Sequence, residues 1–133
     1  MFKSLGTAVV LGMLCTPAIA AQCDSTTQTG MDACTKSTYQ KADDELNADY
    51  KAVLKLIGDN PASRDKFVAS QRAWLKFRDS HCAFVGSATE GGSIHPMVVG
   101  ECLAALTQER VKQLKAFTDC EEGDMSCPVP SPR

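Results

Sequence analysis

The chain lacks the features of several common protein classes. Its 14 Lys and Arg against 16 Asp and Glu leave a formal net charge of −2, which argues against a nucleic-acid-binding surface. Beyond the first 20 residues, no apolar run approaches the roughly 20 residues of a membrane-spanning helix. No segment alternates like a β-strand, and no Cys-x-x-Cys or Gly-x-Ser-x-Gly motif occurs. We therefore expect no nucleic-acid partner and no membrane insertion.

Residues 1–20 have the pattern of a signal peptide. Lys3 precedes the apolar residues 8–14, and Ala18-Ile19-Ala20 matches the A-x-A pattern of a cleavage site. The apolar run is too short to span a membrane. We expect the remaining chain to be a periplasmic or secreted domain, long enough to bury a real core.

Cysteine is abundant, with seven residues, of which Cys15 lies in the signal segment. The other six form an even number, which in an exported chain implies disulfides. Many pairings are open, and we predict the one that joins sequence neighbours: Cys23–Cys34, Cys82–Cys102 and Cys120–Cys127. Zinc binding is the alternative. Because no Cys-x-x-Cys is present and the compartment is oxidising, we predict no metal and no cofactor.

Apolar residues recur every three or four positions in three segments, which predicts three helices. The first should begin with Thr29 as N-cap and Asp32 completing a weak capping box, and should end before Gly58. The link at 58–60 is so short that the next helix should be an antiparallel neighbour.

The second predicted helix begins at Pro61 after the capping residue Asn60 and ends at Gly86, and the third begins near Pro96. The predicted fold is an all-α, three-helix antiparallel bundle stapled by disulfides. Its organisation would be a signal peptide at 1–20, a helical domain at 21–118 and a Cys- and Pro-containing tail at 119–133. We expect that tail to be extended or disordered.

Polar residues interrupt the inner faces of these helices: Asp43, Asn47, Gln71, Arg78, Thr107 and Arg110, with Asp79 at the helix edge. A buried charge must be paired and hydrogen-bonded. Asp43 is available to both Arg78 and Arg110, and Asp79 can join from the helix edge. We interpret the set as a structural polar layer that fixes helix register. A ligand-binding carboxylate–guanidinium site and solvent-exposed pairs without a role are the alternatives.

The two histidines, His81 and His95, have serines nearby in the sequence, and Asp79 would complete the composition of a hydrolase triad. Composition is not a triad, because nucleophile, base and orienting acid must meet in space. We expect His81 to be partly buried and hydrogen-bonded, and His95 to stand at a helix start. We predict no catalytic residues and no enzymatic activity.

The segment before the third helix is a shaped loop, made of Gly91, Gly92, Ser93, Ile94 and His95. The glycines allow tight turns beside the predicted Cys82–Cys102 staple. A loop braced in this way could also be presented to a protein partner at low entropic cost. Both interpretations stay open, and Arg72 is a further candidate contact if it points outward.

The chain resembles the LprI-type lysozyme-inhibitor family of small secreted bacterial domains. The resemblance is carried by Cys23, Thr27, Gln28, Met31, Cys34, Tyr39, Ala42, Asp43, Leu46, Asn47, Tyr50, Gln71-Arg72-Ala73-Trp74, Phe77-Arg78-Asp79, Cys82, Gly91-Gly92-Ser93-Ile94, Pro96-Met97, Cys102-Leu103, Leu106-Thr107 and Arg110. It implies an all-helical, disulfide-braced, exported domain that binds and blocks a lysozyme, and it supplies no catalytic residues. Cys120 and Cys127 lie beyond the shared region, and no cysteine has a lipid-attachment pattern.

Our leading hypothesis is therefore a non-enzymatic, exported protein-binding module that occludes the cleft of a lysozyme, with Ser93 and His95 as contacts. The alternative is a periplasmic envelope stress or assembly factor that binds another protein through its helix faces.

Overall fold

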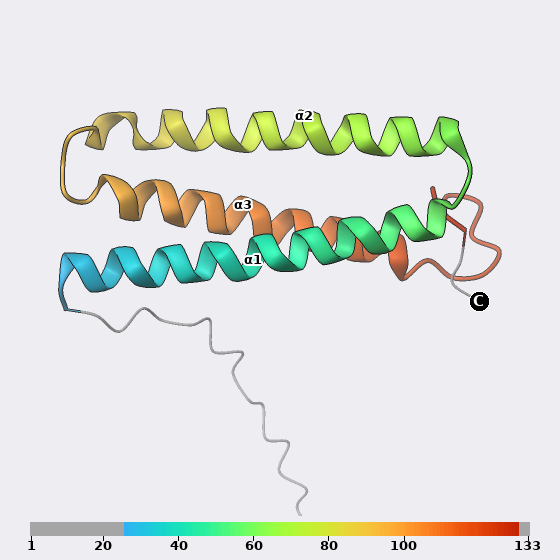
Figure 1. Ribbon diagram of the computed structural model, residues 1–133, viewed down its shortest axis with the longest axis horizontal. Coiled ribbons are helices and arrows are strands. Elements are labelled where there is room, and N and C mark those ends of the chain that lie inside the picture. Colours follow the sequence, from blue (N-terminus) through green and yellow to red (C-terminus); the bar gives the residue numbers. More distant parts are fainter. Residues whose placement is uncertain (1–25, 131–133) are drawn as a thin grey trace, which may run out of the picture.

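The computed structural model describes residues 26–130, which form three long helices and no strand. They are α1 (Gln28–Ile57), α2 (Pro61–Gly86) and α3 (His95–Thr118), with a short 3-10 helix η1 (Ser87–Thr89) after α2. Helix α2 runs antiparallel to α1 and α3, which run parallel to each other (Figure 1). The predicted all-α three-helix bundle is confirmed. The predicted signal peptide lies outside the described residues.

The turn between α1 and α2 follows the sequence pattern. Gly58 ends α1 with a positive φ of 62°, which a glycine adopts without strain. Asn60 caps α2, because its Oδ1 accepts a hydrogen bond from the Ser63 backbone N–H at 3.1 Å, and Pro61 takes the first helical position. The predicted link is confirmed.

The start of α1 differs from the prediction. Thr27, not Thr29, is the N-cap, and its hydroxyl oxygen accepts from the Gly30 N–H at 3.2 Å. Thr27 has the extended backbone that a capping residue needs, whereas Thr29 is already helical. The predicted capping box with Asp32 is therefore wrong; Asp32 instead accepts a hydrogen bond from the Gln28 side chain at 2.8 Å.

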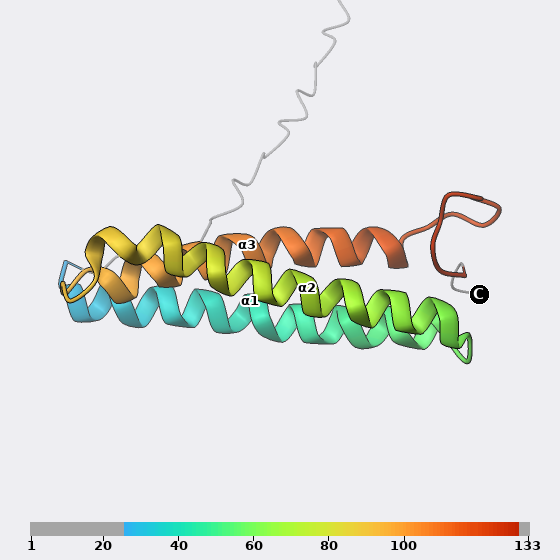
Figure 2. The same cartoon turned by 90° about the horizontal axis from the view of Figure 1, so that it is seen from above.

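Helix α1 packs more closely on α3 than on α2, although α2 follows it in the chain. Small residues make this possible, since Thr35 and Ala42 on α1 are buried, as are Ala104 and Thr107 on α3. A Cβ added to Gly100 would lie 3.3 Å from the Thr35 Cβ. The two parallel helices therefore approach closely. Helix α2 packs over the pair and runs at a slant to both (Figure 2).

Bulky side chains hold α2 farther from α1. The rings of Tyr50 and Phe67 stack with their centroids 5.2 Å apart, and Trp74 is half-buried against the same core. The buried core is built from Leu46, Val53, Ile57, Phe67, Val111, Leu114 and Val129. Within residues 26–130, no helix has both the length and the apolarity needed to cross a membrane.

Two of the predicted disulfides are confirmed. Cys82 of α2 is bonded to Cys102 of α3 with a Cα–Cα distance of 5.6 Å, and Cys120 is bonded to Cys127 with a distance of 5.9 Å. Cys34 is disulfide-bonded, and its predicted partner Cys23 lies outside the described residues.

The C-terminal segment folds back on the bundle instead of extending away from it. Figure 2 shows it at the end where α1 passes into α2. Val129 is only 6% exposed and belongs to the core cluster, so this segment completes the core. The expectation of an extended or disordered tail does not hold through residue 130, because the Cys120–Cys127 bond turns the chain back.

Candidate functional site

The centre of the polar layer is Arg78, which is buried between the three helices. Its Nε donates a hydrogen bond to Asp79 Oδ1 at 2.9 Å, and Nη2 lies 2.9 Å from the same oxygen. Its Nη1 lies 3.5 Å from Asp43 Oδ1 and donates to Thr107 Oγ1 at 3.4 Å. Each guanidinium nitrogen has an acceptor within the protein, which favours the structural interpretation over a ligand site.

Aromatic rings cover both this guanidinium and its neighbour. The Arg78 Cζ lies 5.4 Å from the Tyr39 ring centroid and 5.3 Å from the Trp74 ring, and the Arg110 Cζ lies 5.8 Å from the Trp74 ring. These distances are those of cation–π contacts. Burial raises the pKa of Tyr39, opposed by the positive charge of Arg78, and burial lowers the pKa of Arg110.

Two members of the predicted layer lie elsewhere than expected. Arg110 does not pair with Asp43; its Nε donates to Gln71 Oε1 at 3.1 Å. Asn47 is exposed, and its Nδ2 donates to Asp43 Oδ2 at 3.1 Å from the surface side. The layer thus consists of an Arg78 cluster and an Arg110–Gln71 pair, joined by the ring of Trp74.

The glycine loop is exposed from residue 90 to residue 94. Gly91 has a positive φ of 76°, which explains the glycine at this position. The Gly92 N–H donates to the Thr89 carbonyl at 2.9 Å, and the His95 N–H donates to the Gly92 carbonyl at 3.2 Å. The loop is therefore a hydrogen-bonded turn that presents Ser93 and Ile94 to solvent.

The His95 side chain turns toward the end of α2 and contacts the residues that precede the loop. Its Nδ1 lies 3.1 Å from both the Gly86 carbonyl oxygen and Thr89 Oγ1. Because a carbonyl oxygen only accepts, the contact with Gly86 is a hydrogen bond in the tautomer that carries the hydrogen on Nδ1. The predicted helix-start position is confirmed, and the predicted contact role of His95 stays a prediction.

The other predicted site residues are not brought together with the loop. Arg72 is exposed, but it lies about 20 Å along α2 from Gly86 at 1.5 Å per residue. His81 is also exposed, and its ring stacks on Phe77 with centroids 5.4 Å apart, so the prediction of a partly buried histidine is wrong.

The hydrolase constellation does not assemble in the described part of the chain. The Ser80 hydroxyl donates to the Lys76 carbonyl of its own helix, and Asp79 pairs with Arg78. Residues 26–130 contain no group of three or more His, Cys, Asp or Glu side chains placed to hold a metal ion.

Two aromatic residues that complete the site, Tyr39 and Trp74, were not assigned to the polar layer from the sequence. The available signal was spacing, because Trp74 precedes Arg78 by four residues and so lies on the same helix face.

Comparison with known proteins agrees with this architecture. The family model described as lysozyme inhibitor LprI matches residues 19–114. An uncharacterized protein from Rhizobium meliloti (strain 1021) is 33% identical over 137 residues, covering 90% of this chain and 99% of that protein.

A solved structure of similar fold comes from Pseudomonas putida KT2440. This crystal structure of a DUF1311 family protein matches with a TM-score of 0.63 at 23% identity, covering 68% of this chain and 92% of the other. At this identity the match speaks for the fold. The family match over most of the chain, together with the helical bundle, shows that the chain belongs to the LprI lysozyme-inhibitor family.

Proposed function

We propose that this chain is a non-enzymatic, exported protein-binding module, periplasmic or secreted, that blocks a lysozyme by occluding its cleft. The family description supports the inhibitory role. The disulfides support an extracytoplasmic location, because such bonds persist in oxidising compartments.

The observation that carries the proposal is the braced loop at 90–94. The Cys82–Cys102 bond joins the two helices that flank it, and the His95–Thr89–Gly86 hydrogen bonds close its base. A loop held in one conformation before binding loses little entropy on docking. It is therefore suited to insertion into a concave surface.

The exposed tip has the chemistry that such a cleft requires. The working groups of a lysozyme are two carboxylates. The Ser93 hydroxyl is a hydrogen-bond donor, and Ile94 supplies exposed apolar surface beside it. His95 acts as a support, so its replacement would weaken binding by loosening the loop.

The proposal is tested by assaying the purified mature protein against several lysozymes. We expect loss of lysozyme activity and a complex on a sizing column at micromolar concentration. Replacing residues 91–94 with a neutral linker, with His95 retained, should abolish both while the melting temperature stays within a few degrees. The matched control is Lys55→Ala, an exposed change in the last turn of α1 at the other end of the bundle, which should inhibit like the wild type. An inactive wild-type protein that forms no complex would remove the proposal.

The second candidate function is an envelope assembly or stress factor that binds through its helix faces. The observation that favours it is the exposure of Phe77 and Phe84 on α2. The same loop replacement separates the two functions, because binding through a helix face would survive it.

A further inference from the structure

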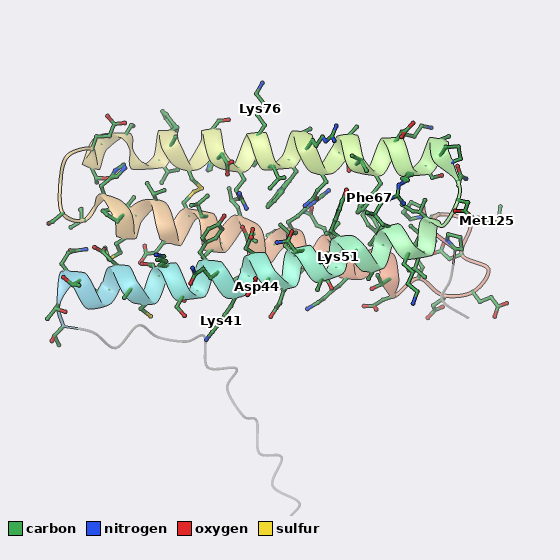
Figure 3. The ribbon with its side chains drawn as sticks, viewed as in Figure 1. Lys41, Asp44, Lys51, Phe67, Lys76 and Met125 are labelled. Carbon is green, nitrogen blue, oxygen red and sulfur yellow. A yellow bond between two sulfur atoms is a disulfide. The ribbon has the colours of Figure 1, made fainter. Side chains whose placement is uncertain are left out.

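The outward face of α2 carries few charged side chains between residues 69 and 88. Its uncharged residues, all exposed, include two from the adjoining η1, and we call this set the outer α2 face: Ala69, Ser70, Ala73, Phe77, Ser80, His81, Ala83 and Phe84 of α2 with Ser87 and Ala88 of η1. The charged side chain of Lys76 lies between them and points away from α1 and α3 (Figure 3). The solvent face of a helix normally carries charged and polar side chains. Here it carries two phenylalanines that are 54% and 76% exposed.

The serine hydroxyls of this face already donate hydrogen bonds within the chain. Ser70 donates its hydroxyl to the Phe67 carbonyl at 2.9 Å, and Ser87 donates to the Phe84 carbonyl at 2.7 Å. The Ser80 hydroxyl donates to a carbonyl of its own helix in the same way. Covering these side chains would therefore leave no hydroxyl without an acceptor.

Large and small residues alternate along this face with heptad spacing. Ala73, Phe77, Ser80, Phe84 and Ser87 follow one another at intervals of four, three, four and three. This is the a/d spacing of a helix–helix seam, with phenylalanine at one position and a small residue at the other. When two such seams run antiparallel, each a position faces a d position of the partner, so every phenylalanine meets a small side chain. In a parallel pair, phenylalanines would face each other and the small residues would leave gaps.

We propose that two copies of this chain pair through the outer α2 face, α2 against α2 in antiparallel orientation about a twofold axis. The occupant that this surface fits is a second copy, because a twofold contact requires a self-complementary patch and the alternation of large and small residues supplies it.

The area is sufficient for a weak dimer. A phenylalanine side chain buries about 200 Å², so Phe77 and Phe84 of both copies would cover roughly 500 Å² between them. The alanine, serine and histidine positions bring the total near the low end of stable interfaces, about 1,200 Å². The antiparallel arrangement places the two loops at 90–94 at opposite ends of the seam. The pairing is independent of the proposed inhibitory function.

Sedimentation equilibrium of the mature protein over a concentration series tests the pairing. We expect a monomer–dimer equilibrium with a dissociation constant in the micromolar range. Phe84→Ser should weaken it about a hundredfold, because the lost apolar contact counts twice in a twofold dimer. Met125→Ser, at a residue that is 97% exposed on the tail (Figure 3), is the matched control and should leave the equilibrium unchanged.

A second variant distinguishes specific packing of the two α2 helices from non-specific hydrophobic association. Ser80→Phe enlarges the exposed apolar surface, so non-specific association would become tighter. In the antiparallel seam it places a phenylalanine against a phenylalanine, so the dimer should be lost. Circular dichroism melts check that the surface variants remain folded. A wild-type protein that is monomeric up to about 500 μM, well above the expected range, or tighter association of Ser80→Phe, would overturn the proposal.

Discussion

Replacing Arg78 with alanine tests whether the buried guanidinium stabilises the bundle. The side chain is 8% exposed, its guanidinium lies over the rings of Tyr39 and Trp74, and it donates to Thr107, which is fully buried. Truncation would remove all of these contacts at once. It would not change the fold of α2, because alanine favours helix.

The magnitude follows from three losses. Removing the aliphatic stem from a packed site costs about 1–2 kcal/mol. Two partly desolvated cation–π contacts contribute about 1 kcal/mol together, and a buried threonine hydroxyl left without its donor costs about 1 kcal/mol. Asp43 and Asp79 are 38% and 63% exposed, so water solvates them when their partner is removed. We therefore expect a loss of about 3–4 kcal/mol in unfolding free energy, with no large term for a stranded charge.

Urea denaturation followed by circular dichroism measures this loss for Arg78→Ala. Arg72→Ala is the matched control, an exposed arginine on the same helix, and should change the unfolding free energy by less than about 0.5 kcal/mol. Arg78→Met, which keeps the volume of the stem, should recover at least half of the loss. A cost below about 1 kcal/mol for Arg78→Ala would refute the reasoning, because a buried group with these contacts cannot be removed so cheaply.

Three further predictions follow from the packing. The raised pKa of Tyr39 means that its stabilising contribution is complete below pH 10, the ordinary tyrosine pKa, and is lost as the pH rises through the higher folded-state pKa. A tyrosinate absorbance titration should therefore lose its most alkaline component in Tyr39→Phe. Gly100→Leu should lower the unfolding free energy by about 1–3 kcal/mol, measured by thermal melts, because the added side chain would force α1 and α3 apart at Thr35. Val129→Ser should cost about 1.5–3 kcal/mol in the same assay, whereas Met125→Ser on the same tail should cost almost nothing.

The sequence was sufficient for the end of α1 and the start of α2, where glycine, asparagine and proline have strong local preferences. Gly58, Asn60 and Pro61 act through their own backbone and capping preferences, and these operate in any tertiary setting. Two disulfide pairings were also predictable. Cys82 and Cys102 flank one helix–loop–helix segment, which brings their Cα atoms to 5.6 Å.

The remaining features depend on how each helix is rotated and spaced, which periodicity does not fix. Asn47 follows the buried Leu46 by one residue, and that 100° step carries it to the surface. The side chain of His95 turns inward because the Gly86 carbonyl and Thr89 hydroxyl lie within reach, a contact between separate elements. The close approach of α1 and α3 likewise depends on a glycine opposite Thr35, which pairs residues far apart in sequence.

Occlusion of a lysozyme cleft is tested most directly by competition. Calorimetric titration of the chain into a susceptible lysozyme would be performed with and without a saturating N-acetylglucosamine oligomer bound in the cleft. If the 90–94 loop enters the cleft, the oligomer should weaken binding in proportion to its own occupancy, and the loop-replaced variant should not bind. Undiminished binding in the presence of the oligomer would contradict the account.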